Sequence, residues 1–271
     1  MREIWDEWRW DIWDPANEPL PENAKIHRKI SICTNCMNRL HDLMVTLPVN
    51  LYLNRDYPNV EFVLLNYNSQ DKMDDWVRDY MMPYMEAGIL IYVHTTEPSF
   101  YRPAHSRNVS FKVATGDIVT NVDADNFTGP GFAKMLNLLA ELQPERAAFS
   151  AEKVLMHGRV GFYKDEWLEL GGYDEDLVGY SWEDYNLFFR AMAAGFRLMW
   201  WGHWGSRFTD RIFTSREDKV RYMECKHQVF TEFVNERSTL RKLDRRQFTA
   251  NQDREWGKAT LVKNFHEVIE V

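Results

Sequence analysis

The sequence predicts an α/β fold in which a mostly parallel β-sheet is flanked by helices and followed by a helical C-terminal tail. Apolar segments of strand length alternate with segments of helical periodicity from residue 29 to residue 122. Polar residues, Thr34, Asn66 and Asp123, stand where successive predicted strands end. Because ligands of such sheets bind outside the carboxyl ends of the strands, these residues predict a site along one rim of the sheet.

The predicted elements follow one another as a series of strand–helix units. Strands are predicted at residues 29–34, 61–65, 89–93 and 117–122, and helices at residues 40–53, 73–85 and 104–115. Leu43, Leu47 and Leu51 form one apolar face of the first helix, and Gly88 follows the end of the second. A strand that returns to the same sheet through a helix makes a right-handed crossover, so the strands are predicted to be parallel.

The two ends of the chain differ in composition from its middle. Residues 1–28 carry four tryptophans among acidic residues, and three prolines at positions 15, 19 and 21 interrupt regular structure. This pattern favours an arm that packs on the main domain over an interfacial or acceptor-binding segment, since anionic lipid would repel the acids. Residues 29–206 are predicted to form the main domain and residues 207–271 a helical extension packed on it.

Bulk composition excludes several classes of protein. The net charge of −8 and the pI near 5.5 argue against a nucleic-acid partner. No apolar run has the length needed to cross a bilayer, and residues 1–6 lack the apolar core of a secretory signal. A cytoplasmic location is therefore predicted, and peripheral contact with a membrane stays open. The oligomeric state is not predicted.

The three cysteines do not form a disulfide framework. Cys33 and Cys36 have a Cys-x-x-Cys spacing, which also occurs in redox motifs and, with a second pair of ligands such as Cys225 and His227, in zinc sites. Ordinary cysteines at the end of a strand are the favoured interpretation.

Asp123-Ala124-Asp125 carries the strongest chemical signal. Side chains at positions i and i+2 of an extended backbone point to the same face, so the two carboxylates leave the strand together. Adjacent carboxylates favour a shared hard cation such as Mg²⁺ or Mn²⁺. Since Mg²⁺ is held by one or two carboxylates together with substrate phosphates, a diphosphate-bearing substrate is indicated.

Further motifs surround this pair in a fixed order. Residues 104–108 read Ala-His-Ser-Arg-Asn, residues 171–175 read Gly-Gly-Tyr-Asp-Glu, and residues 179–184 read Gly-Tyr-Ser-Trp-Glu-Asp before an amphipathic run. Together these motifs resemble the nucleotide-sugar-dependent glycosyltransferases of the GT-A fold, above all inverting family 2. They also resemble the galactosyltransferase-like and the chondroitin or hyaluronan synthase-like branches. The resemblance covers about residues 29–206.

The resemblance implies roles for the metal site. Asp125 would be the more direct ligand of Mn²⁺ or Mg²⁺, and Asp123 would lie near the ribose and a metal-bound water. His203, in a segment similar to the family's His-x-Gly-Ser strand end, would reach the metal or the diphosphate. A histidine among tryptophans is also commonly a packed core residue, and both interpretations stay open.

The resemblance also implies the catalytic residues. Asp184 would be the general base that deprotonates the acceptor hydroxyl, and Glu183 would position the acceptor. Trp182 would stack on a sugar ring of the acceptor. Carboxylates are favoured at a helix start by the helix dipole, so capping is the competing interpretation.

Nucleotide recognition departs from the family pattern. Relatives carry Asp-Asp-Gly-Ser after the second strand, whereas this chain has Asn66-Tyr67-Asn68-Ser69, so Asn66 or Asn68 would take over contacts to the nucleobase and ribose. Thr34 and Asn35 are predicted to line the same pocket, and Arg39 to approach the diphosphate.

A second pair of residues matches the family ahead of the central strand. Arg107 and Asn108 occupy the positions of its Arg-Asn pair, where Arg107 would bind phosphate or form a buried salt bridge to a metal-site aspartate. The segment at residues 158–161 is predicted to pass the donor sugar closely, since its glycines allow backbone approach.

The sequence therefore predicts an inverting, metal-dependent glycosyltransferase. It would move a hexose or N-acetylhexosamine from a UDP-sugar to a hydroxyl of a glycan or another acceptor. A non-catalytic nucleotide-sugar or glycan-binding module is the main alternative. A sugar nucleotidyltransferase fits less well, because no Gly-rich basic loop follows the first strand. The donor sugar and the acceptor stay open.

Overall fold

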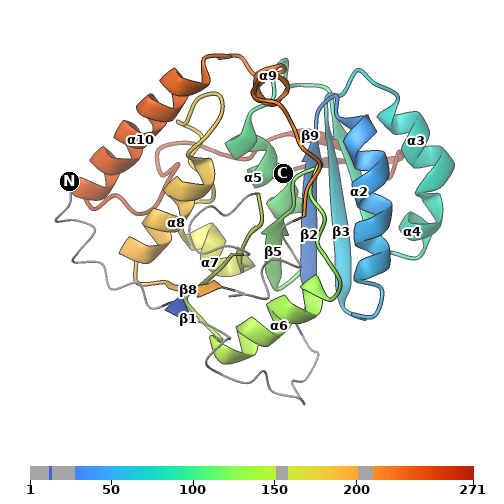
Figure 1. The fold of residues 1–271 in the computed structure, drawn as a ribbon, viewed down its shortest axis with the longest axis horizontal. Coiled ribbons are helices and arrows are strands. Elements are labelled where there is room, and N and C mark those ends of the chain that lie inside the picture. Colours follow the sequence, from blue (N-terminus) through green and yellow to red (C-terminus); the bar gives the residue numbers. More distant parts are fainter. Residues whose placement is uncertain (1–11, 14–27, 151–157, 201–209) are drawn as a thin grey trace.

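The computed structural model describes residues 28–150, 158–200 and 210–271, and the backbone of residues 12–13. One ten-stranded sheet runs through them in the order β1-β8-β6-β7-β5-β2-β3-β4-β9-β10 (Figure 1). The strands are β1 (Ile12–Trp13), β2 (Ile30–Cys36), β3 (Val60–Tyr67), β4 (Leu90–Thr95), β5 (Ile118–Asn121), β6 (Ala147–Ser150), β7 (Val160–Tyr163), β8 (Arg197–Trp200), β9 (Thr260–Lys263) and β10 (Glu267–Glu270). Within this sheet only β7 and β9 run against the other strands. The mostly parallel α/β fold is thus confirmed.

Helices cover both faces of the sheet. One face packs on α2 (Leu40–Leu53), α3 (Met73–Tyr80), α4 (Met82–Glu86) and α6 (Phe132–Leu142). The other face packs on α5 (Pro103–Val113), α7 (Lys164–Glu169) and α8 (Glu183–Ala193). Two apolar cores result, because the fully buried central strands alternate their side chains between the faces.

The C-terminal region combines helices and strands. After α9 (Arg216–Val220), α10 (Gln228–Asp244) packs on α8, and the hairpin β9–β10 then adds to the edge of the sheet beside β4 (Figure 1). The helical tail predicted from the sequence is present. Its last two strands were not predicted, because each contains only two apolar residues and gives no apolar run of strand length.

The other elements match the prediction closely. The helix predicted at residues 73–85 is divided at Met81, because Pro83 lacks a backbone N–H and lies in the first turn of the short α4, which begins at Met82. Of the Trp-rich arm, the structure describes only the backbone of residues 12–13, which pairs with β8.

Two findings bear on the competing interpretations. Cys33 and Cys36 are buried free cysteines, and burial raises the pKa of both thiols, which disfavours a redox role. In the described ranges, no cluster of three or more His, Cys, Asp or Glu side chains is arranged to hold a metal ion, and no helix is both long and apolar enough to span a membrane.

Candidate active site

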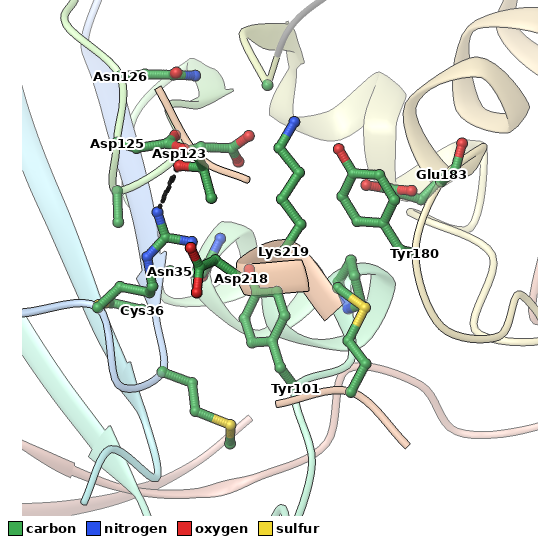
Figure 2. Close-up of a pocket in the computed structure, with 18 of the residues that line it drawn as sticks. Asn35, Cys36, Tyr101, Asp123, Asp125, Asn126, Tyr180, Glu183, Asp218 and Lys219 are labelled. Atoms are coloured by element: carbon green, nitrogen blue, oxygen red, sulfur yellow. Dashed lines mark hydrogen bonds and ion pairs between the residues drawn. The ribbon is translucent and has the colours of Figure 1, made fainter. Parts of the chain in front are cut away.

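A cavity of about 450 Å³ opens at the carboxyl ends of β2 and β5 (Figure 2). It brings together residues separated by almost 190 positions in the sequence. The predicted site residues in its lining are Asn35, Arg39, Arg107, Asp123, Asp125, Trp182, Glu183 and Asp184. Topology therefore places the Asp-x-Asp pair and the Glu-Asp pair on one cavity, as expected for the rim of a parallel sheet.

Asp123 is held by a chain of side-chain amides. Asn35 donates its Nδ2 hydrogen bond to Asn121 Oδ1 (3.1 Å), and Asn121 Nδ2 donates to Asp123 Oδ1 (2.8 Å). Asn121 Nδ2 also donates to the carbonyl of Gly158 (2.8 Å). A Cβ on Gly158 would lie 1.9 Å from Asp123 Oδ2, so a side chain at this position would displace the carboxylate. The predicted close backbone approach of this glycine is therefore made to Asp123.

Asp125 lies beside Asp123 in a drier position. Burial and the neighbouring Asp123 raise its pKa, while Thr214 and Arg39 act to lower it. The Thr214 hydroxyl donates to Asp125 Oδ2 (2.7 Å), and Arg39 Nη2 lies 3.6 Å from the same oxygen. The side chain of Arg39 is oriented by Asp42, which accepts from its Nε at 2.7 Å.

This pair fits a hard divalent cation bound together with a substrate. Because the charge of Asp123 raises the pKa of Asp125, a cation shared by the two carboxylates would stabilise them. The described part of the chain supplies only these two carboxylates and no third clustered ligand, so phosphate and water oxygens would complete the coordination. His203, the third predicted ligand, lies outside the described residues.

Arg107 joins the two acidic pairs. Its Nη1 lies 2.6 Å from Glu183 Oε1 and 3.3 Å from Asp184 Oδ1, and its Nη2 lies 3.1 Å from Asp123 Oδ1. Burial acts to lower the pKa of Arg107, but these three carboxylates raise it well above its usual value. The predicted buried salt bridge to a metal-site aspartate is observed.

Asp184 combines burial with an excess of negative charge. Burial is the main cause that raises its pKa to about 7, Glu183 and Asp123 add to the effect, and Arg107 opposes it. A carboxylate with a pKa near neutrality is well matched to accept a proton from a hydroxyl, since it is ionised in part and still basic.

A strained turn places this acid at the start of α8. Ser181 and Trp182 both have positive φ, 86° and 77°, which is costly for residues other than glycine. Helix α10 holds the turn, because Asn235 Nδ2 donates to the carbonyls of Val178 and Ser181 (2.9 Å each) and Thr231 donates to that of Tyr180 (2.9 Å). Trp182 lines the cavity and packs on the aromatic rings of α8.

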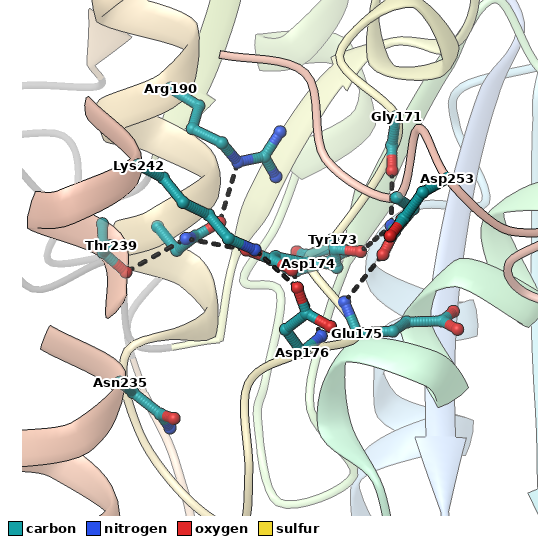
Figure 3. A network of polar contacts seen from close by, with 12 residues as sticks. Gly171, Tyr173, Asp174, Glu175, Asp176, Arg190, Asn235, Thr239, Lys242 and Asp253 are labelled. Carbon is teal, nitrogen blue, oxygen red and sulfur yellow. Dashed lines mark hydrogen bonds and ion pairs between the residues drawn. The ribbon is translucent and has the colours of Figure 1, made fainter. Parts of the chain in front are cut away.

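The preceding turn is fixed by a buried polar network (Figure 3). Lys242 of α10 forms ion pairs with Asp174 (2.6 Å) and Asp176 (2.7 Å). Arg190 donates to the carbonyls of Leu170 (2.7 Å) and Gly172 (2.6 Å). These bonds satisfy backbone groups that would otherwise be buried without partners, so the turn between α7 and α8 has little freedom.

Four predicted nucleotide-binding residues do not line the cavity. Thr34 is buried in β2. Asn66 Nδ2 donates to Asp74 Oδ1 (2.8 Å), and Asn68 Nδ2 donates to the carbonyl of Pro98 (2.7 Å). Asn108 bonds both backbone groups of Tyr173, at 2.8 and 2.9 Å. Each of the three asparagines is thus engaged by the protein itself.

The sequence analysis missed one wall of the cavity, contributed by residues 210–223. The backbone N–H of Ile212 donates to the carbonyl of Asp125 (2.7 Å), and that of Tyr101 donates to the carbonyl of Tyr222 (2.8 Å). Thr214 and Lys219 both line the cavity between these points. No local pattern marks them, since they meet Asp125 only through the tertiary fold.

Comparisons with known proteins identify the family and the fold. The model of glycosyl transferase family 2 matches residues 31–194, more than half of the chain. The protein therefore belongs to glycosyl transferase family 2. No match was found among curated protein sequences.

Solved structures share the fold at low sequence identity. A mannosyltransferase, PcManGT from Pyrobaculum calidifontis in complex with GDP-Man and Mn²⁺, is 22% identical with a TM-score of 0.54, over 74% of this chain and 60% of its own. GalNAc-T7 with UDP, GalNAc and Mn²⁺ is 13% identical with a TM-score of 0.54, over 64% of this chain and 41% of its own. S. aureus TarS in complex with UDP is 16% identical with a TM-score of 0.55, over 80% of this chain and 73% of its own. This chain thus spans less than two thirds of the first two proteins.

Proposed function

We propose that the protein is a metal-dependent, inverting glycosyltransferase that transfers a hexose or N-acetylhexosamine from a UDP-sugar to an acceptor hydroxyl. The observation that supports this most is the position of Arg107, whose two terminal nitrogens contact Glu183 and Asp184 on one side and Asp123 on the other. A candidate base and a candidate metal site therefore face one cavity, as a single displacement requires.

In the proposed reaction the acceptor hydroxyl enters beside Asp184. Its proton passes to the Asp184 carboxylate while its oxygen forms a bond to the anomeric carbon of the donor. The bond from that carbon to the phosphate oxygen breaks, and its electron pair stays on the departing diphosphate. Attack and departure on opposite sides of the carbon invert its configuration.

Asp123 and Asp125 would hold the divalent cation, Mn²⁺ or Mg²⁺. Such an ion neutralises charge on the phosphate oxygens as the leaving group departs. Glu183 binds Arg107 and thereby keeps it between Asp123 and Asp184. Trp182 offers an aromatic surface for a sugar ring of the acceptor.

The nucleobase is the least constrained part of the proposal. Asn35 lines the cavity, whereas Asn66 and Asn68 do not. Similar structures contain UDP or GDP-Man, so GDP is the alternative nucleotide. A glycan acceptor and a cytoplasmic location stay predictions.

Calorimetry with UDP and GDP, with and without Mn²⁺, tests the proposal on the whole chain. We expect one nucleotide to bind tightly only with Mn²⁺. Asp125→Ala should remove this metal-dependent binding, whereas Asp165→Asn, a matched change at an exposed position in α7, should leave it unchanged. Metal-independent binding, or no binding of either nucleotide, would refute the metal-dependent function and favour a non-catalytic module.

A further inference from the structure

The cations around the cavity differ in whether they form ion pairs with carboxylates. Among the described residues, its lining includes five acids and four cations. The acids are Asp123, Asp125, Glu183, Asp184 and Asp218, and the cations are Arg39, Arg107, Arg211 and Lys219. Arg39 and Arg107 are both engaged by carboxylates, whereas Lys219 has no ion pair with any acid in the described part of the chain.

Lys219 stands on a well-anchored wall. Its helix, α9, begins at the N-cap Ser215, whose side chain accepts from the backbone N–H of Asp218 (3.1 Å). On either side of α9 the backbone is bonded to Asp125 and to Tyr101, as described above, and Met223 is buried. The position of the Lys219 backbone is therefore fixed relative to the aspartates.

The Lys219 side chain extends into the cavity. Figure 2 shows it between Asp123 and Asp125 on one side and Tyr180 and Glu183 on the other. Its Nζ lies 5.6 Å from the centroid of the Tyr180 ring, a cation–π contact that leaves the three N–H donors without a carboxylate partner. An ammonium group placed in this way is suited to bind an anion that enters the cavity.

We propose that Lys219 binds the diphosphate of the donor from the side opposite the metal-binding aspartates, and neutralises the departing diphosphate. This inference rests on the proposed function. The four cations and five acids leave the lining with one excess negative charge, so a divalent ion makes it positive by one. A nucleotide sugar with two negative charges on its diphosphate then cancels the charge of the ion and brings the net charge back to −1.

Cleavage of the bond to the sugar adds a negative charge to the terminal phosphate. Lys219 takes no part in the proton transfer, because the acceptor proton passes to Asp184. Hydrogen bonds between charged groups are worth about 1.5–3 kcal/mol, so loss of Lys219 should weaken diphosphate binding roughly ten- to a hundredfold.

Calorimetry with UDP and UMP in the presence of Mn²⁺ separates this role from a general one. We expect Lys219→Gln to lower the affinity for UDP at least tenfold and to change the affinity for UMP little, so that the preference for UDP over UMP falls. Lys219→Arg should keep most of this preference. Arg216→Gln, a change at an exposed position in the same helix, should behave like the wild type.

The outcomes distinguish this inference from the proposed function. If the wild type binds neither UDP nor GDP with Mn²⁺, the proposed function fails. If the wild type binds UDP but Lys219→Gln retains the preference for UDP over UMP, only the role of Lys219 is overturned. This holds whether the affinities of Lys219→Gln for UDP and UMP are both unchanged or both fall by the same factor. Lys219→Met, which keeps the aliphatic stem, repeats the measurement if the glutamine variant unfolds at a lower temperature.

Discussion

The two walls of the cavity are built in opposite ways. The wall with the candidate base is a strained turn ahead of α8, supported from behind by buried hydrogen bonds from α10. The wall with the candidate metal ligands is the end of β5, crossed by residues 210–223 and open to the cavity. The side chain of Asp184 is 15% exposed and that of Asp123 is 37% exposed. Asp125, on the same wall as Asp123, is 17% exposed, so the contrast in exposure lies between Asp184 and Asp123.

This difference matches the two chemical tasks. A general base must be basic near neutral pH, and burial is the means by which a carboxylate is made so. A metal-binding carboxylate must stay ionised and reachable, since water and phosphate complete the coordination. One guanidinium, that of Arg107, connects the two environments, because it offers a separate nitrogen to each.

Replacing the base should give the largest effect. Asp184→Asn keeps the shape of the side chain but removes proton acceptance, so we expect kcat to fall roughly 10²–10⁴-fold. The affinity for UDP with Mn²⁺ should change little, because the other wall is intact. Initial rates with the donor found by calorimetry, compared with those of Asp165→Asn, provide the measurement. A variant that transfers sugar at the wild-type rate would exclude Asp184 as the base.

Loosening the support of the same wall should give a smaller effect. Asn235 makes three hydrogen bonds to the turn, two as donor and one from the Val178 N–H (3.0 Å). Asn235→Ala leaves buried backbone groups without partners, so we expect a loss of about 1–3 kcal/mol in stability. Because the turn positions Asp184, kcat should also fall, by about tenfold if roughly 1.4 kcal/mol of alignment is lost.

The control for this variant is Ser238→Ala in the same helix, whose side chain is not bonded to the turn. Urea denaturation gives the stability. The ratio of the change in kcat to the change in UDP affinity shows whether the substitution acts on the wall with the candidate base or on the wall with the candidate metal ligands. Equal losses in both quantities would show that Asn235 supports the whole fold and does not act on the base wall in particular.

The contrast between the walls also explains what the sequence could predict. Asp123, Asp125 and Asp184 are found from short motifs, because each follows directly from the end of a strand or the start of a helix. The strands β2 to β5 are found from apolar runs that burial on both faces imposes. Strands β6, β7 and β8 were not predicted.

Residues whose role depends on distant partners could not be assigned in this way. Asn66 and Asn108 have a residue type suited to nucleotide binding, but their amides are satisfied by Asp74 and by the backbone of Tyr173. Lys219 lies in a tail that resembles any charged helical surface, and only the fold places it opposite Asp125. Of the three polar residues at predicted strand ends, Asp123 lines the cavity whereas Thr34 and Asn66 do not, so a position at a strand end does not by itself assign a role.

The last prediction concerns stability as a function of pH. The pKa of Asp184 is raised from 3.8 to about 7 in the folded protein, so between these values the folded state holds a proton that the unfolded state has released. The contribution of Asp184 to stability must therefore fall as the pH rises through this window. Asp184→Asn does not titrate, so its melting temperature relative to the wild type should rise between pH 4 and pH 8, by roughly 10 °C if the full difference between the two pKa values, about 4 kcal/mol, is expressed. Thermal denaturation across this range checks the sign, with Asp165→Asn expected to give a constant difference. The opposite result would be a melting temperature of the wild type that rises relative to that of Asp184→Asn as the pH rises. The pKa of Asp184 would then be lowered by Arg107 instead of raised by burial, and the description of Asp184 as a buried base would be wrong.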